Sequence, residues 1–335
     1  MVRSEFTFPS ADGKTAIHAV EWLPEGAIRA VLQISHGVAE YILRYEPLAA
    51  YLTARGFAVV GHDHLGHGAS VAEGVPRLYF GPPGSWDLVV EDLYTCRRHC
   101  ARRFPGVPLF LLGHSMGSFL VRTYLIRHPG TVDGAILMGT GHMRPGFLAV
   151  GKAFAAHEIR RLGAERPSSA VARLSFGAYN RTFAPNRTAF DWISANAANV
   201  DAYVADPLCG GNPTMGLFRE MLRGLSFISR FEHLKRMDPA TPVIFLSGSM
   251  DPVGEFGRGV RRAFRAFQKA GVRDAAMKLY PGLRHEILNE ADRERIFGDL
   301  FQWMVQRIPG AAPTSEAPPH PASPAKSAAS TRYPQ

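Results

Sequence analysis

The stretch that decides the fold of this chain is FLLGHSMGS, residues 110–118. Its apolar residues indicate a short buried strand, and the residues that follow, up to Arg127, carry apolar side chains at helical spacing. Between strand and helix stands Gly-x-Ser-x-Gly, in which Gly113 and Gly117 leave room for a tight turn around Ser115. Such a turn lifts the serine hydroxyl above the end of a sheet, at a helix N-terminus that favours developing negative charge. The stretch therefore predicts a nucleophilic serine.

Strands and helices alternate on both sides of this turn. The apolar runs predict strands at Glu5–Phe8, Ala16–Leu23, Ala30–Ser35, Phe57–Gly61, Leu109–Leu112, Gly134–Met138, Val243–Leu246 and Met277–Tyr280. The amphipathic stretches predict helices at Tyr45–Arg55, at Trp86–Phe104, from the serine to His128, at Arg258–Ala270 and at Asp292–Ile308. Apolar strands separated by amphipathic helices are typical of a mostly parallel sheet covered on both faces. The predicted fold class is therefore α/β.

Residues 141–236 interrupt this alternation, because no strand pattern occurs there and the composition is helical with many aromatic residues. A connection of that length between neighbouring strands is far longer than usual. We therefore expect a helical cap over the strand ends, inserted between two core segments, 1–140 and 237–308. Residues 309–335 are rich in Pro, Ala and Ser and have little to bury, so we expect a disordered tail there.

Within the expected cap, a group of apolar side chains is available to contact an apolar part of a substrate: Phe147, Leu148, Val150, Phe154 and Phe176. The same side chains could equally form the core of the cap itself. The sequence leaves both interpretations open.

The composition excludes some classes of protein. Of the 335 residues, 46% are hydrophobic and 20% are charged, which is ordinary for a soluble globular chain. The net charge of +9 comes mainly from scattered arginines, without the basic and aromatic stripe of a nucleic-acid surface, so we expect no nucleic-acid partner. Weak contact with an anionic membrane surface stays open. The oligomeric state cannot be predicted.

The location of the protein is predicted from what the sequence lacks. No apolar run approaches the length of a membrane span, and residues 1–6 do not resemble the apolar core of a signal peptide. The three cysteines, Cys96, Cys100 and Cys209, are too few for a disulfide framework. We therefore expect a cytoplasmic protein.

A serine nucleophile needs a base that takes its proton and a third group that orients the base. On α/β scaffolds with this turn, the chain order is serine, then acid, then histidine. Asp251 follows the predicted strand Val243–Leu246, and His285 follows the predicted strand that ends at Tyr280. Both positions lie after strand ends, where α/β sheets place reactive groups. We therefore predict that Ser115, Asp251 and His285 form a catalytic triad.

The oxyanion that forms when such a serine attacks a carbonyl group requires two N–H donors. One is expected from Met116, the residue after the serine. The other is expected from Val38, in the loop that follows the strand ending at Ser35, where Gly37 allows the chain to turn inward.

A competing pattern is the histidine cluster formed by His62, His64 and His67, which comes directly after a strand and superficially suits a metal-dependent hydrolase. No further ligands follow at a recognisable spacing. The segment from Asp63 to Ser70 instead fits a turn held by side-chain hydrogen bonds. We therefore predict neither a metal nor a cofactor.

Taken together, the motifs resemble the serine α/β-hydrolases of the monoacylglycerol lipase and lysophospholipase group, over about residues 5–308. The matching motifs are HGVAE at 36–40 followed by Arg44 and Tyr45, DHLGHGAS at 63–70, GHSMG at 113–117 and PGLRHEILNE at 281–290. The resemblance implies the same triad, Ser115, Asp251 and His285, with Val38 and Met116 as oxyanion donors. It also implies the α/β-hydrolase fold and a cap that forms a tunnel for an acyl chain.

The chain departs from the pattern of this group at two places. Ser118 stands where such proteins usually have a further glycine, and Val38 with Ala39 replaces smaller residues of the oxyanion loop. The cap segment 191–210 is more similar to bacterial members than to animal lipases.

The expected function is hydrolysis of carboxylic esters of the acylglycerol or lysophospholipid type, through an acyl-serine intermediate. A peptidase, a thioesterase or an acyltransferase would use the same triad, and these remain alternatives. A non-catalytic binding protein would not need all three groups. An epoxide hydrolase or a haloalkane dehalogenase is disfavoured, because these enzymes need a carboxylate where Ser115 stands.

Overall fold

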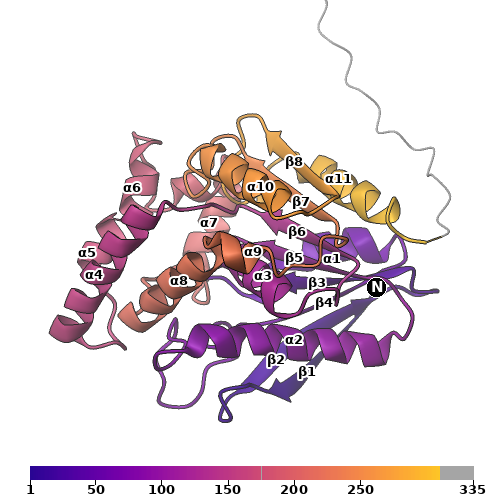
Figure 1. Ribbon diagram of the computed structural model, residues 1–335, viewed down its shortest axis with the longest axis horizontal. Helices are drawn as coiled ribbons and strands as arrows, with labels where there is room; N and C mark the ends of the chain where they lie inside the picture. Colours follow the sequence, from indigo (N-terminus) through magenta and orange to yellow (C-terminus); the bar gives the residue numbers. More distant parts are fainter. Residues whose placement is uncertain (175, 310–335) are drawn as a thin grey trace, which may run out of the picture.

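The computed structural model describes residues 1–174 and 176–309, apart from the side chains of residues 174 and 176 (Figure 1). One sheet has the strand order β1-β2-β4-β3-β5-β6-β7-β8. Its strands are β1 (Val2–Pro9), β2 (Ala16–Leu23), β3 (Ala30–Ser35), β4 (Phe57–His62), β5 (Leu109–His114), β6 (Gly134–Met138), β7 (Val243–Gly248) and β8 (Ala275–Tyr280). The hairpin β1–β2 and the pair β2–β4 are antiparallel, and the other pairs are parallel. The prediction of a mostly parallel α/β fold is confirmed.

All eight predicted strands are present, but several are longer than predicted. β1 begins at Val2 rather than Glu5, and β8 begins at Ala275 rather than Met277. These strands lie at the two edges of the sheet, where their side chains are largely exposed or half-buried. Backbone pairing, such as Val2 with Leu23, rather than an apolar pattern defines their extent.

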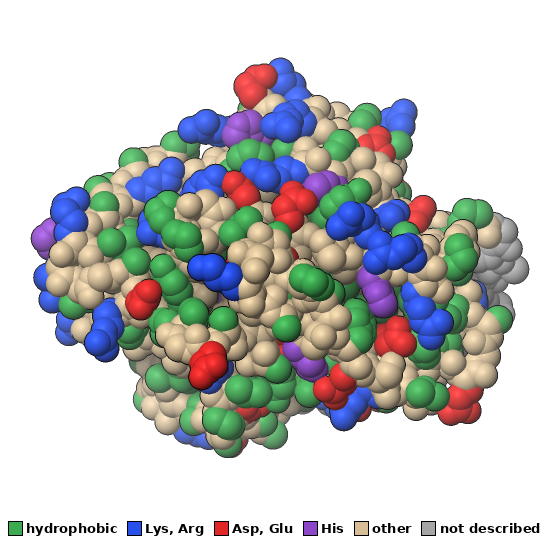
Figure 2. Space-filling model, turned by 90° about the horizontal axis from the view of Figure 1, so that it is seen from below, with side chains coloured by type: hydrophobic (Ala, Val, Ile, Leu, Met, Phe, Trp, Pro, Cys, Tyr) green, Lys and Arg blue, Asp and Glu red, His purple; other side chains and the backbone are tan. Residues whose placement is uncertain are grey.

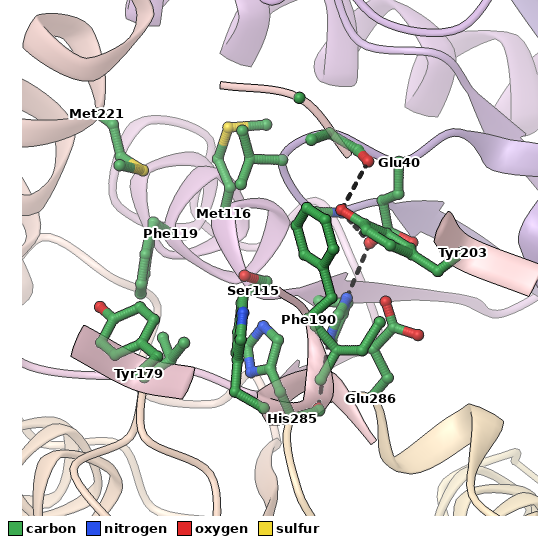
Figure 3. Close-up of a pocket in the computed structure, with 18 of the residues that line it drawn as sticks. Glu40, Ser115, Met116, Phe119, Tyr179, Phe190, Tyr203, Met221, His285 and Glu286 are labelled. Atoms are coloured by element: carbon green, nitrogen blue, oxygen red, sulfur yellow. Dashed lines mark hydrogen bonds and ion pairs between the residues drawn. The ribbon is translucent and has the colours of Figure 1, made fainter. Parts of the chain in front are cut away.

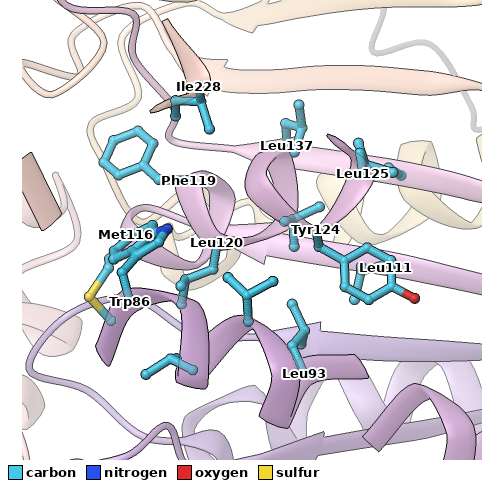
Figure 4. Packing of buried hydrophobic residues seen from close by; sticks show 14 of the residues in the cluster. Trp86, Leu93, Leu111, Met116, Phe119, Leu120, Tyr124, Leu125, Leu137 and Ile228 are labelled. Atoms are coloured by element: carbon cyan, nitrogen blue, oxygen red, sulfur yellow. The ribbon is translucent and has the colours of Figure 1, made fainter. Parts of the chain in front are cut away.

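Successive side chains of the buried strands point to opposite faces of the sheet, so both faces are apolar. Helices cover both of these faces. Val31 and Leu111 belong to the core under one helical layer, and Leu32 and Leu112 belong to the core under the other. The first layer contains α2 (Ser85–Arg103), α3 (Met116–Arg127) and α10 (Arg258–Lys269), and the second contains α1 (Glu46–Thr53) and α11 (Arg293–Val305). Figure 4 shows side chains of α2 and α3 packed against β5 and β6. These five helices confirm the predicted ones, with ends shifted by at most three residues.

Between β6 and β7 the chain forms helices at one end of the sheet. They are α4 (Pro145–Leu162), α5 (Ser169–Leu174), α6 (Phe176–Arg181), α7 (Ala197–Ala205), α8 (Met215–Ile228) and α9 (Phe231–Leu234). In Figure 1, α4, α5 and α6 lie furthest from the sheet, and α8 lies between α4 and α3. We call residues 141–236 the cap. Of the predicted tail, residues 310–335 lie outside the described part of the chain.

The cap is anchored to the core where α8 meets the start of α2. A Cβ atom added to Gly224 would lie 2.2 Å from the ring of Trp86, so only glycine allows this close packing. The carboxylate of Glu220, fully buried on α8, accepts hydrogen bonds from the N–H groups of Gly84 and Trp86, each at 3.1 Å. An anion at this position satisfies N–H groups that have no partner inside the helix and interacts favourably with the helix dipole.

Replacement of Glu220 by alanine should destabilise the chain, because it leaves the buried N–H groups at the start of α2 without an acceptor. We expect a loss of roughly 2–4 kcal/mol in the free energy of unfolding, measured by urea denaturation. Glu220→Gln keeps one acceptor oxygen and should lose less. Glu232→Ala is the control, because the Glu232 side chain is 75% exposed and its ion pair with Lys235 lies at the surface. Equal stability of Glu220→Ala and Glu232→Ala would contradict this account.

Candidate active site

The backbone at Ser115 is strained in the way that the sequence motif predicts. Ser115 connects β5 to α3 with φ 52° and ψ −121°, a conformation that residues with a Cβ atom rarely adopt. The turn is held by two close approaches of the backbone. A Cβ atom on Gly117 would lie 2.0 Å from the carbonyl oxygen of Ser35, and one on Gly113 would lie 2.5 Å from that of Gly117. Ser118, at the position of the missing glycine, donates its Oγ–H to the Ser115 carbonyl oxygen at 2.6 Å.

Asp251 and His285 follow the carboxyl ends of β7 and β8, and their side chains meet. Nδ1 of His285 lies 3.0 Å from Oδ1 of Asp251, and both residues are almost completely buried. The carboxylate is fixed from two further sides, because Oδ1 accepts from the Val253 N–H at 2.9 Å and Oδ2 accepts from Ser247 Oγ at 3.2 Å. A carboxylate in this position holds the imidazole in one orientation and one tautomer, with Nε2 left for another partner.

Ser115 and His285 both line one pocket, and Figure 3 shows them side by side. The structure thus brings together the three residues of the predicted triad, although they stand on three different strand ends. It also places Val38 and Met116 in the lining of the same pocket.

The two predicted N–H donors flank Ser115. Met116 is the first residue of α3, so its N–H has no acceptor within the helix. The loop that carries Val38 lies against the serine, since a Cβ atom on Gly37 would be 3.1 Å from Cβ of Ser115. Within residues 1–174 and 176–309, the Val38 N–H donates to no protein acceptor. Both N–H groups are therefore available for an oxygen atom bound beside Ser115.

The pocket is mainly apolar and contains about 760 Å³ of empty space, including its open mouth. Its aromatic, aliphatic and thioether side chains come from the core and from the cap. They are Val38, Ala39, Met116, Phe119, Met143, Tyr179, Phe190, Trp192, Ile193, Tyr203, Met221, Leu225 and Val253. A pocket of this kind fits a hydrophobic ligand that reaches the serine.

Of the two interpretations that the sequence left open for the apolar cap residues, the described side chains support a packing role for Leu148 and Phe154 and a substrate contact for none. Phe147 and Val150 on α4 are 67% and 71% exposed, Leu148 is buried in the core, and Phe154 packs against that core. The side chain of Phe176 lies outside the described part. None of the four described side chains lines the pocket, because α4 turns one face to α8 and the other to solvent. The residues that do line it stand mostly on short segments and loops of the cap, where no helical periodicity reveals them.

A buried charged network forms the wall behind Ser115 and His285. Oε1 of Glu40 lies 2.9 Å from Nδ1 of His114, the residue before the serine, and accepts from the Gly37 N–H at 2.5 Å. Arg44 bridges Glu40 and Glu286, with N–O distances of 3.0 Å and 2.7 Å. Glu286 adjoins His285 in the chain. The network therefore ties the loop of Val38, the turn of Ser115 and the loop of His285 to one another.

The charges of this network stabilise each other. Burial alone would raise the pKa of Glu40, but its hydrogen bond to His114 and the charges of His114 and Arg44 hold that pKa well below its ordinary value. Burial alone would lower the pKa of His114, but the hydrogen bond and charge of Glu40 raise it. Burial alone would raise the pKa of Glu286, but the charge of Arg44 and its hydrogen bond together lower it. Both carboxylates are therefore ionised at neutral pH.

This network was not predicted from the sequence. In the sequence, Glu40, Arg44 and Glu286 occur only as members of the family motifs at 36–45 and 281–290. The spacing of four residues between Glu40 and Arg44 is the one local signal that these two side chains form an ion pair. The contact of Arg44 with Glu286 joins segments 242 residues apart, which no local pattern reveals.

The histidine cluster forms a packed turn. His62, His64 and His67 are fully buried, and the ring of His64 bonds to Ser35 Oγ at 2.9 Å. The carboxylate of Asp63 accepts from the N–H groups of Ile42 at 2.8 Å and Ala69 at 2.9 Å. The predicted turn held by side-chain hydrogen bonds is therefore confirmed. In the described part of the chain, no group of three or more His, Cys, Asp or Glu side chains is arranged to hold a metal ion.

Two further observations concern the predicted location. The three cysteines form no disulfide within the described chain, and Cys96 and Cys100 are buried. Among the described helices, none is long and apolar enough to span a bilayer.

Comparison with known proteins identifies a family of hydrolases and similar proteins that are lipases. The model of the Hydrolase_4 family, described as serine aminopeptidase, S33, matches residues 26–292. The monoacylglycerol lipase of Mycolicibacterium smegmatis is 29% identical over 313 residues, which cover 91% of this chain and 98% of that protein. The monoglyceride lipase of Homo sapiens is 27% identical over 297 residues, which cover 88% of each chain.

A solved structure agrees with these relatives. The crystal structure of a thermostable carboxyl esterase from Bacillus coagulans, in complex with glycerol, is similar with a TM-score of 0.85 and 26% identity, over 92% of this chain and 99% of that chain. The resemblance stated from the sequence motifs is thereby confirmed. The chain belongs to the Hydrolase_4 family and is a serine hydrolase of the α/β-hydrolase fold, similar to monoacylglycerol lipases.

Proposed function

We propose that this enzyme hydrolyses the ester bond of acylglycerols through an acyl intermediate on Ser115. The observation that carries the proposal is the paired His285 and Asp251 beside a strained serine that lines an apolar pocket. The names of the relatives support it, since those compared above are lipases and an esterase. They do not favour the peptidase, thioesterase and acyltransferase alternatives.

The first half of the reaction acylates the serine. Nε2 of His285 takes the proton of the Ser115 hydroxyl while Oγ attacks the ester carbonyl carbon. Asp251 keeps the imidazole oriented and stabilises its positive charge. The N–H groups of Val38 and Met116 donate to the oxygen that becomes negative. When the tetrahedral intermediate collapses, His285 returns the proton to the leaving alcohol oxygen, and an ester of Ser115 remains.

The second half releases the acid. A water molecule gives a proton to His285 as its oxygen attacks the carbonyl carbon of the acyl-serine, and the same two N–H groups stabilise the oxyanion. Collapse of this intermediate returns the proton to Oγ of Ser115. The products are a carboxylic acid and the original serine.

The two ends of the pocket fit the two ends of a monoacylglycerol. The apolar part, with Phe119, Met221 and Leu225, suits an acyl chain. The charged side chains that line the polar end are Glu40, His114 and Glu286. Arg44 and His114 in this network already have carboxylate partners, which favours a neutral glycerol group over the phosphate of a lysophospholipid. The glycerol bound in the Bacillus coagulans esterase supports the same choice.

We further propose that the cap makes weak contact with the lipid surface that carries the substrate. Phe147 and Val150 lie exposed on one helix, and Lys152 follows them on α4. Contact through a few apolar side chains and a basic one would be shallow and reversible. Figure 2 shows that basic side chains on one face are spread among acidic ones rather than gathered in a block. A cytoplasmic location is also part of this proposal, and the free cysteines are consistent with it.

Hydrolysis of monoacylglycerols graded in chain length should peak at medium or long chains. The Ser115→Ala variant should lose at least about 10³-fold in kcat with its melting temperature unchanged, because only the nucleophile is removed. A lysophospholipid of the same chain length should be hydrolysed more slowly. Release of fatty acid is the measurement. Wild-type turnover confined to short esters would contradict the acylglycerol proposal, and unchanged turnover in Ser115→Ala would contradict the mechanism.

Replacement of Asp251 by asparagine should keep the shape of the site and lose the charge that orients His285. We expect kcat to fall by about 10⁴-fold while KM stays within a few fold, as for other triads that lose this charge. Steady-state kinetics on one monoacylglycerol provide the test. The matched control is Asp274→Asn, since Asp274 forms a surface ion pair with Arg307 and should leave kcat unchanged. A loss of less than tenfold in Asp251→Asn would argue against its role.

A further inference from the structure

We propose that the cap holds the oxyanion loop in its working shape, and that Tyr203 is the positioning residue that does so. The loop consists of residues 36–40, which carry the Val38 N–H. This inference rests on the proposed function, because it takes that N–H as an oxyanion donor. It goes further because it makes the position of this donor depend on hydrogen bonds that the cap supplies.

The evidence is at the carbonyl group of Ala39, directly after Val38. Its oxygen accepts two hydrogen bonds, one from the hydroxyl of Tyr203 at 3.0 Å and one from the N–H of Gly210 at 2.9 Å. Both donors belong to the cap and stand more than 160 residues away in the chain. Tyr203 lies on α7, and Figure 3 shows its hydroxyl directed at the loop beside Glu40. Ala39 and Tyr203 are 4% and 6% exposed, so water does not readily replace these bonds.

The loop needs such support because its backbone is unfavourable. Ala39 has φ 57°, in the left-handed region that a residue with a Cβ atom seldom adopts without tertiary contacts. On the other side of Val38, the N–H of Gly37 donates to Glu40 Oε1 at 2.5 Å. Val38 is therefore held between two anchors, one within the core and the other from the cap. Loss of the cap anchor frees the strained residue next to the donor.

The hydroxyl of Tyr203 is suited to a permanent structural role. Burial raises the pKa of Tyr203 far above its ordinary value, so the hydroxyl keeps its proton and remains a donor at any working pH. Its ring also lines the pocket, but the hydroxyl hydrogen is directed to Ala39. Removal of the hydroxyl should therefore change the oxyanion loop, while the ring that lines the pocket remains in place for the substrate.

α7 also reaches the loop of the catalytic histidine. Nδ2 of Asn199 donates to Glu286 at 2.9 Å, next to His285 in the chain. One cap helix thus contacts the loops on both sides of Ser115. These contacts of the cap with the two loops complete the site.

The test compares Tyr203→Phe with a matched control, Tyr41→Phe. The hydroxyl of Tyr41 donates to Asp206 in the cap at 2.8 Å, so its loss also removes one hydrogen bond between cap and core, but not at Ala39. The substrate is p-nitrophenyl butyrate, whose short chain makes few contacts with the cap. Rates are divided by the concentration of serine that a fluorophosphonate titrates, which corrects for any unfolded fraction.

We expect Tyr203→Phe to lower kcat about tenfold with KM within twofold, since complete loss of one oxyanion donor costs about 10²–10³-fold and a loosened donor costs less. Affinity for an alkyl trifluoromethyl ketone, which forms a tetrahedral oxyanion on the serine, should fall by the same factor as kcat/KM. Tyr41→Phe should change each quantity less than twofold. Gly210 has φ 69°, so an alanine there strains the segment that donates the second hydrogen bond to Ala39. Gly210→Ala should therefore lower kcat about threefold. It provides the test if Tyr203→Phe does not fold.

Equal effects of Tyr203→Phe and Tyr41→Phe, or an effect on KM alone, would overturn the inference while the proposed function stands. If the wild-type enzyme neither reacts with the fluorophosphonate nor hydrolyses the ester, the proposed function fails, and this inference fails with it.

Discussion

The arrangement of the site depends on the close approach of Gly117 to the end of β3. No side chain fits there, because a Cβ atom would lie 2.0 Å from the carbonyl oxygen of Ser35. The approach puts the first turn of α3 against the strand end from which the oxyanion loop departs. It also forces Ser115 into its strained turn. One steric constraint thereby brings the serine, the helix N-terminus and the loop of Val38 together.

The sheet brings the remaining groups to the same place. β5, β7 and β8 are parallel to one another, so their carboxyl ends lie at the same end of the sheet. The residues that follow these ends are Ser115, Asp251 and His285. The buried pair of Glu40 and His114, with Arg44 and Glu286, then ties the three loops together in a region of low dielectric constant. Such a network is stable only when each charge has its partner, which makes the geometry specific. The chain thus combines a rigid core with a cap that completes the oxyanion loop.

The sequence was sufficient to predict the core of the fold and the candidate triad, because both have local sequence patterns. Apolar runs predict the buried strands, and Gly113, Ser115 and Gly117 form a motif whose glycines have a steric reason. Asp251 and His285 could be identified among many acids and histidines for two reasons. They follow the serine in the expected order, and each follows a predicted strand. The edge strands were predicted too short, since exposed residues such as those of β1 carry no apolar pattern.

The cap and the charged network could not be predicted in the same way. The residues of the cap that line the pocket, such as Phe190 and Trp192, stand outside its long helices, whereas the conspicuous Phe147 faces solvent. The bonds of Tyr203 and Gly210 to Ala39 join distant segments through a backbone carbonyl group, for which side-chain identity gives no signal. Contacts of this kind follow from the tertiary packing of the cap on the core.

We propose that Ser115 is the nucleophile of this enzyme. The most direct measurement is mass spectrometry of the wild-type chain after reaction with a p-nitrophenyl phosphonate, followed by proteolysis. We predict one phosphonyl group per chain, on the peptide that contains Ser115, with release of one equivalent of p-nitrophenol. Modification of a different residue, or no modification of a folded chain, would contradict the account.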